Sequence, residues 1–324
     1  MTRSPILPCS LVLLVLAWLD GPPNASPVRS AAAPASFEAS PDPSQATFSA
    51  DSAYAHLRTQ VGFGPRVPGS SGHAAQLAWM TAYLRERADT VILQSFEQRT
   101  SAGDRLALTN VFARFQPDAR QRILLLAHWD TRPTADAERD EDRRKQPIPG
   151  ANDGASGTAV LIELANVLSR HSPRIGVDLL FVDGEDWGPG EEDMYLGAKY
   201  FAANLPPGYK PMYGILLDMV GDRDPVFEVE GNSEEMAPEI VDRVWRLAED
   251  MGFGRIFRSG SGTYVTDDHL PLNRAGIRTI DIIDFTYGPG NRYWHTLGDD
   301  LPNTSPRGLG IVGSVLVRLI EQGG

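Results

Sequence analysis

Cysteine is almost absent from this sequence. The 324 residues include a single one, Cys9, which lies within an apolar segment near the N-terminus. Because a disulfide needs two thiols, the chain cannot form one within itself. An exported protein that had lost this segment would contain no cysteine.

Basic residues are also scarce. Lys and Arg number 30 against 42 Asp and Glu, which gives a net charge of −12 and a pI near 5.0. Nucleic acids and anionic membrane surfaces bind basic patches. The one basic run, residues 143–145, follows a mixed-charge stretch and is typical of a solvated loop. We therefore expect no nucleic-acid partner and no extensive membrane contact.

The apolar run at residues 6–19 is shorter than the roughly 20 residues that span a bilayer. Arg3 precedes it and small residues follow at 31–35, a pattern typical of a signal peptide. We expect residues 1–33 to be a signal peptide or an N-terminal anchor, and the protein to be exported to the periplasm or secreted. Residues 34–48, rich in Pro, Ala and Ser, predict a disordered linker before a folded domain at 49–324.

The rest of the chain alternates strand-like and helix-like segments, and no internal repeat is apparent. Strands are expected at residues 91–98, 106–115, 123–127, 177–182, 213–220 and 279–285. Helices are expected at residues 51–61, 74–88, 158–169, 196–203, 235–251 and 307–321. This order predicts a single α/β domain with a mixed, mostly parallel central sheet and helices on both faces. The first two strands would form an antiparallel pair at one edge.

Polar residues follow these strands at their carboxyl ends, where open α/β sheets bind ligands. The strand at 177–182 runs into Glu185 and Asp186, and the strand at 123–127 runs into His128. Asp218 lies inside a buried strand, where an acid is costly unless it is paired or ligated. Taken alone, Glu185 and Asp186 fit a solvated acidic turn equally well. Asp153, just before a helix, fits a helix N-cap or a turn residue.

Five of these side chains form a candidate metal-binding set, in which each residue lies at a strand end or in the loop after one. Carboxylate oxygens with imidazole nitrogens are the ligand mixture of catalytic zinc sites, which keep one position open. Spacing alone does not distinguish such a site from structural residues. His56, His73 and His171 lie in no motif and are expected at the surface. The set consists of His128, Asp153, Asp186, Asp218 and His295.

Five motifs, taken together and in order, resemble the zinc peptidases of the M28 aminopeptidase family. They are His128-Trp-Asp130, Gly150-Ala-Asn-Asp153, Gly184-Glu-Asp186, Leu217-Asp218 and His295-Thr296. Within that family the chain is more similar to the glutaminyl cyclase branch, particularly its bacterial members, which resemble the animal type. That likeness rests on residues 128–133, 267–269 and 294–296; many peptidases have serine at position 267 and tyrosine at position 294.

The resemblance implies a zinc aminopeptidase-like fold with one zinc ion per chain, bound by Asp153, Asp186 and His295. It also implies that Glu185 is the general base and acid, with Asp218 and Asp267 completing a proton-sharing network. Animal cyclases carry glutamate in place of Asp186, which shifts that ligand by about one methylene. Aromatic residues expected at the substrate are Trp187, Tyr287 and Trp294, with Phe285 and Tyr293 as further pocket-wall candidates.

The implied reaction is cyclisation of the N-terminal glutamine of peptides or proteins to pyroglutamate, with release of ammonia, an acyltransferase reaction. The main alternative is an M28 aminopeptidase with two zinc ions, because His128 and Asp218 are the two further ligands that it would need. A binding protein without enzymatic activity is a third reading, which the intact Glu185 and the complete ligand set disfavour. The sequence leaves both metal counts open.

Overall fold

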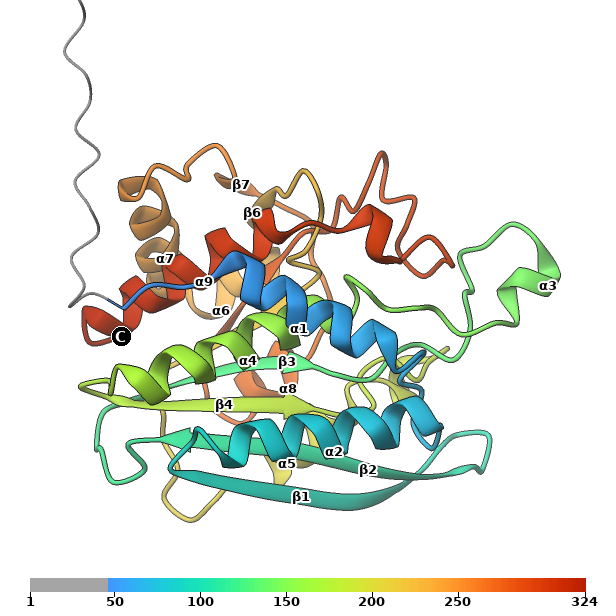
Figure 1. Cartoon of the computed structure of the whole chain (residues 1–324), viewed down its shortest axis with the longest axis horizontal. Coiled ribbons are helices and arrows are strands. Elements are labelled where there is room, and N and C mark those ends of the chain that lie inside the picture. The colour runs from blue at the N-terminus through green and yellow to red at the C-terminus, as the bar shows by residue number, and fades with distance from the viewer. Residues whose placement is uncertain (1–45) are drawn as a thin grey trace, which may run out of the picture. The chain divides into compact units, whose positions relative to one another are not determined.

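The computed structural model describes residues 46–324, which build a six-stranded sheet in the order β1-β2-β4-β3-β5-β8 (Figure 1). An antiparallel hairpin of β1 (Thr90–Arg99) and β2 (Arg105–Phe115) forms one edge, and β2 also runs antiparallel to β4 (Gly176–Val182). The remaining strands, β3 (Arg122–His128), β5 (Gly214–Asp218) and β8 (Thr279–Ile283), run parallel to β4. The predicted mixed, mostly parallel sheet is therefore confirmed.

Successive residues of β3 point to opposite faces of the sheet, and helices cover both faces. On one face, Ile123 and Leu125 pack in the same core as α4 (Ala155–Arg170). On the other, Leu124 and Leu126 pack with residues of α5 (Leu196–Ala203) and α8 (His269–Arg274). Every residue of β3 and of β4 is buried, as expected for parallel strands covered on both sides.

The α4 face carries most of the remaining helices. Figure 1 shows α1 (Ala50–Gly62), α2 (Ser71–Arg85) and α4 on the near side of the sheet. The C-terminal α9 (Pro306–Glu321) packs against both α1 and α4, and α7 (Pro238–Asp250) packs against α9. No helix among the described residues is long and apolar enough to cross a membrane.

Three local features differ from the sequence predictions. The helix expected at 235–251 is two helices, α6 (Gly231–Met236) and α7, because Pro238 cannot continue a helix but suits a first turn. The strands β6 (Phe227–Val229) and β7 (Phe257–Ser261), which form a separate two-stranded sheet, were not predicted. His73, expected at the surface, is buried and stacks on Trp129 at 4.3 Å between ring centroids. The short elements α3 (Glu141–Arg144), η1 (Glu191–Asp193) and η2 (Leu301–Asn303) lie in connecting segments.

The described chain begins inside the predicted linker. The Ala46 N–H donates to Glu321 Oε1 at 3.3 Å. The Phe48 ring packs directly on Gly313 of α9, where an added Cβ would meet it at 2.4 Å. Residues 46–48 thus pack against α9 and belong to the folded domain. The predicted signal segment and residues 34–45 lie outside the described residues.

A buried ion-pair network ties β2, β3 and β4 together at the end of the sheet opposite the predicted site. Asp178 of β4 is fully buried and accepts hydrogen bonds from Arg114 Nε at 3.0 Å and Arg122 Nε at 2.6 Å. The Tyr209 hydroxyl donates to the same carboxylate at 2.9 Å. Removing one partner of such a group leaves the others buried without their counter-charge.

We expect Asp178→Ala to lower the free energy of unfolding by about 3–5 kcal/mol, because Arg122 would remain buried without its carboxylate. Urea unfolding of the purified protein measures this change. The matched control is Asp242→Ala, which breaks an exposed pair with Arg246 at 3.0 Å and should cost less than about 1 kcal/mol. Equal losses in the two variants would contradict the role given to Asp178.

Candidate metal centre and catalytic cavity

A cavity of about 570 Å³ opens at the carboxyl ends of the parallel strands. Its walls combine apolar and aromatic side chains with an unusual density of acids. Arg132 is the one lysine or arginine among the described residues that line it. Six carboxylates line it, those of Asp136, Asp153, Glu185, Asp186, Asp218 and Asp267.

Asp153 is placed by a tight turn ahead of α4. Gly154 has φ +93°, and an added Cβ would lie 2.5 Å from the Asp130 carbonyl oxygen, so only glycine fits there. The helix cap is Gly154, without a side-chain hydrogen bond, so the N-cap reading of Asp153 is wrong. The buried Asp299 carboxylate instead holds the turn by accepting from the backbone N–H of Asn152 at 2.7 Å and of Asp153 at 3.2 Å.

Glu185 and Asp186 are placed in the same way by another buried carboxylate. Asp130 Oδ1 accepts from the Glu185 N–H at 3.1 Å, and its Oδ2 accepts from the Asp186 N–H at 3.2 Å. Both side chains are nearly fully buried, which rules out the solvated acidic turn. One residue of the motif at 128–130 therefore sets the backbone of the motif at 184–186.

Asp153, Asp186 and His295 converge, with one ligand atom from each lying within 4.8 Å of the others. His295 Nε2 lies 3.7 Å from Asp153 Oδ2 and 3.6 Å from Asp186 Oδ1. His295 has φ +53°, and its ring stacks on Trp294 at 3.7 Å between centroids. All three predicted zinc ligands therefore face one point.

His128 and Asp218 join Asp153 in a second group on its other side. His128 Nε2 lies 3.2 Å from Asp153 Oδ1 and 3.3 Å from Asp218 Oδ1. One ligand atom from each of the three residues also lies within 4.8 Å of the others. The fold thus brings together all five residues of the predicted set, with Asp153 shared between the two groups.

The chemistry of these groups fits a metal cation. Asp186 Oδ2 is buried and has no hydrogen-bond partner. Burial, followed by the charge of Asp153, raises the pKa of Asp186 to about 7. A cation bound between the carboxylates would offset this repulsion. Oxygen and nitrogen donors with one vacant acceptor are what a zinc ion requires.

Glu185 and Asp267 lie beside the ligands and line the same cavity. Burial raises the pKa of Glu185 well above its ordinary value; His128 opposes that rise, and the charges of Asp186 and Asp267 add to it. Burial and the charge of Asp218 likewise raise the pKa of Asp267. In the described part of the chain, no hydrogen bond directly joins Asp267 to Asp218 or Glu185. The predicted proton-sharing network is therefore an electrostatic cluster in this structure.

The predicted aromatic residues divide between the cavity and the core. Trp294 and Phe285 line the cavity, with ring centroids 5.3 Å apart. Trp187 packs instead against the cluster of Phe96, Leu106, Leu108 and Leu196. Tyr287 is fully buried and donates to Asp299 Oδ1 at 3.0 Å, and Tyr293 packs against it at 5.3 Å between ring centroids.

Trp187 and Tyr287 are therefore not among the lining residues of this cavity, and their contact with substrate stays a prediction. Tyr287 donates to Asp299, the carboxylate that also holds the turn at Asp153. The sequence reasoning missed several lining residues, among them Asp136, Met194, Tyr195 and Tyr264. Arg132 could have been found in the motif at 128–133. Asp136 lies in a loop with no pattern to signal it.

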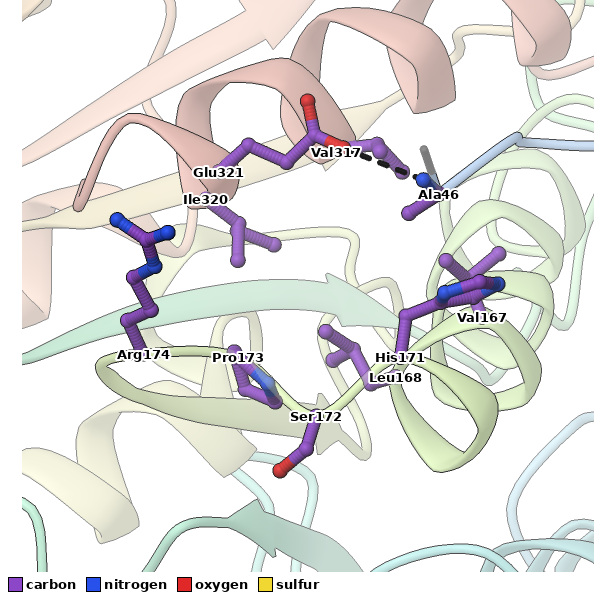
Figure 2. Close-up of a pocket in the computed structure, with 10 residues that line it drawn as sticks. All are labelled: Ala46, Val167, Leu168, His171, Ser172, Pro173, Arg174, Val317, Ile320 and Glu321. Atoms are coloured by element: carbon purple, nitrogen blue, oxygen red, sulfur yellow. Dashed lines mark hydrogen bonds between the residues drawn. The ribbon is translucent and has the colours of Figure 1, made fainter. Parts of the chain in front are cut away.

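A second cavity, of about 400 Å³, lies between the C-terminal ends of α4 and α9 (Figure 2). Val317, Ile320 and Glu321 of α9 line one side of it, and the Ala46–Glu321 hydrogen bond crosses its edge. His171 lines the other side. Both groups among residues 46–324 that could hold a metal ion lie at the strand ends instead, so we place the candidate catalytic site there.

Comparisons with known proteins agree with this site. The model of peptidase family M28 matches residues 110–320, which include all five residues of the predicted metal-binding set. The chain belongs to peptidase family M28. A glutaminyl-peptide cyclotransferase from Drosophila melanogaster is 27% identical over 276 residues, which cover 76% of this chain and 74% of the fly protein.

Two solved M28-like structures from Bacteroides thetaiotaomicron are also similar, each with a TM-score of 0.82. A glutaminyl cyclase bound to N-acetylhistamine is 39% identical and covers 85% of this chain and 98% of its own. A protein described as a leucine aminopeptidase precursor is 40% identical and covers 85% and 97%. Within family M28, this chain groups with the glutaminyl cyclases, which confirms the narrower resemblance seen in the motifs.

The placement of Tyr287 gives a direct test. We expect Tyr287→Phe to lower the free energy of unfolding by about 1–2 kcal/mol, because buried Asp299 loses a donor. The Michaelis constant should stay unchanged, because Tyr287 does not touch the cavity. Trp294→Ala is the matched comparison and should raise the Michaelis constant with little effect on unfolding. A raised Michaelis constant in Tyr287→Phe at unchanged stability would reinstate Tyr287 as a substrate contact.

Proposed function

We propose that this M28 protein catalyses the cyclisation of N-terminal glutamine of peptides and proteins to pyroglutamate, releasing ammonia. One zinc ion per chain would be held by Asp153, Asp186 and His295, with Glu185 as the group that transfers the proton. The observation that carries the proposal is the convergence of that ligand group with Glu185 and Asp267 in one cavity. The names of its curated and solved relatives support it.

In this reaction the substrate's α-amine attacks its own side-chain amide carbon, closes a five-membered ring and expels ammonia. A zinc ion held by the three ligands would supply Lewis-acid polarisation of the amide carbonyl. The cluster of carboxylates attracts a positively charged N-terminus into the cavity. It also favours peptide N-termini over anionic ligands.

Glu185 is the group that transfers the proton during the reaction. It takes one from the attacking amine and returns it to the departing nitrogen, so that ammonia leaves as a neutral molecule. A carboxyl that accepts and then donates needs a pKa well above its ordinary value. Burial provides that rise for Glu185, with repulsion from Asp186 and Asp267 adding to it.

The cavity walls favour cyclisation over hydrolysis. Ile283, Phe285 and Trp294 surround the acids with apolar surface, and such surface keeps competing water away from a reactive carbonyl. Asp267 stands where the resemblance expects serine in many peptidases. Its carboxyl group next to Asp218 turns an acidic face toward an incoming amine.

An aminopeptidase is the second candidate, and two observations favour it. His128, Asp153 and Asp218 form a second metal-binding group. A similar solved structure is described as a leucine aminopeptidase precursor. A hydrolase of this kind would hold two metal ions and use a water molecule as nucleophile.

We also propose that the protein is exported, as Arg3 and the apolar run at residues 6–19 predict. Its substrates would then be peptides or proteins outside the cytoplasm. The proposed chemistry of the site does not depend on export.

A paired assay tests the activity. We expect purified protein to convert Gln-naphthylamide to pyroglutamate and to leave Leu-nitroanilide intact. Glu185→Gln keeps size and shape but cannot carry a proton, so turnover should fall by about 10² or more with bound zinc retained. Leucine release by the unmodified protein without cyclisation would place the aminopeptidase first. Near-normal turnover of the variant would remove Glu185 from the mechanism.

Metal analysis tests the ligands. We expect about one zinc ion per chain, bound through three protein ligands with one open position. His295→Ala should lose most of this zinc, whereas His171→Ala, which changes an exposed histidine away from the site, should keep it. Two tightly bound zinc ions per chain would favour the peptidase, and full zinc in His295→Ala would remove that ligand assignment.

A further inference from the structure

Arg132 lies between a ligand of the metal centre and a carboxylate that no motif predicts. Its Nη1 donates to Asp186 Oδ1 at 2.5 Å. Its Nε and Nη2 both donate to Asp136 Oδ2, at 3.0 and 2.7 Å. The other oxygen of the same carboxylate, Asp136 Oδ1, lies 3.2 Å from His295 Nδ1. One chain of contacts thus runs from Asp186 through Arg132 and Asp136 to His295.

We propose that Arg132 and Asp136 act as a clamp that orients Asp186 and His295 toward the metal ion and thereby sets the affinity of the site. The inference rests on the metal centre of the proposed function. Both are positioning residues, because they act through the two ligands. The effect to be measured is zinc affinity, which can be followed without any assay of turnover.

The contacts leave one free acceptor on each ligand. Arg132 occupies Asp186 Oδ1, while Asp186 Oδ2 is buried with no partner. Asp136 Oδ1 is placed to accept a hydrogen bond from His295 Nδ1–H, which leaves the Nε2 lone pair free. A hydrogen bond at one ring nitrogen fixes the tautomer and the ring orientation at the other. The clamp therefore limits how far each of the two ligand side chains can turn.

The positive charge of Arg132 is a second reason to assign it this orienting role. Six carboxylates line the cavity, and Arg132 is the one residue with a permanent positive charge among its described lining residues. Its planar fork can donate to two carboxylates at once, which a lysine ammonium cannot do with the same geometry. Arg132 is almost fully buried, so its pairing with Asp186 is little screened by water.

The backbone at Gly188 leaves space for the Arg132 guanidinium. Gly188 follows Asp186 by two residues and has φ +55°, and an added Cβ would lie 2.7 Å from the Arg132 guanidinium. The guanidinium therefore packs against backbone that carries no side chain. The turn that carries Asp186 therefore also contacts Arg132, the residue that orients Asp186.

The clamp is tested by zinc affinity in buffers of fixed free zinc, measured by chelator competition on the full chain. We expect Arg132→Met and Asp136→Asn each to weaken zinc binding by about 10- to 100-fold, the range for a group that orients a ligand. Because Arg132 and Asp136 also contact each other, the double variant should lose less zinc affinity than the product of the two single losses. Arg132→Lys should fall between the wild type and Arg132→Met.

A second readout separates positioning from damage to the fold. If the variants only misplace the ligands, raising free zinc until the site fills should restore most of the cyclisation turnover. The thermal midpoint of the metal-free protein should remain near that of the wild type in Asp136→Asn, because the Asp136 side chain is partly exposed. Arg132→Met also leaves Asp186 buried without its partner and should lower the midpoint. The matched controls are Asp142→Asn, in the same loop with its partner Lys145, and Arg246→Met on α7. Both should bind zinc as the wild type does.

The outcomes distinguish the two proposals. Clamp variants that bind zinc as tightly as the wild type would overturn the clamp and leave the proposed function standing. Losses that saturating zinc does not restore would show a structural role and would also overturn it. A wild-type protein that binds no zinc would overturn the proposed function and the clamp with it.

Discussion

The site depends on holding several carboxylates close together in a buried place. Such an arrangement is unfavourable by itself, because each acid loses water and repels its neighbours. The chain answers by fixing the turns that carry these acids. Asp130 and Asp299 are both buried and accept backbone N–H groups from the turns that carry Glu185, Asp186 and Asp153. Arg132 adds a full positive charge beside Asp186.

The sheet explains why these turns meet. The strands β3, β4, β5 and β8 run parallel, so the segments that follow them all leave at the same edge. His128, Glu185 and Asp218 come from three different strands yet line or border one cavity. The six-stranded core holds that edge rigid, because both faces of β3 and β4 are buried. The ion pairs of Asp178 stabilise the opposite end of the same strands.

The same ligand geometry is compatible with cyclisation and with hydrolysis. The residues around the ligands differ in which reaction they suit. Asp153 belongs to both metal-binding groups, as a di-metal peptidase would require. The same cavity is also lined by Asp267 and by the apolar side chains of Phe285 and Trp294. Under the proposed function these residues favour an attacking amine over an attacking water. Discrimination would then rest on residues around the metal site more than on the ligands.

The sequence by itself predicted the six strands of the main sheet, their mostly parallel arrangement and the five residues of the candidate metal-binding set. These follow from local signals, since apolar runs mark buried strands and short polar motifs mark their ends. The tertiary structure alone decided which side chains share the cavity. Asp136 meets His295 across a long loop, and Tyr287 turns under the site instead of into it. Contacts between residues far apart along the chain fix the directions of these two side chains. No local sequence pattern predicts such contacts.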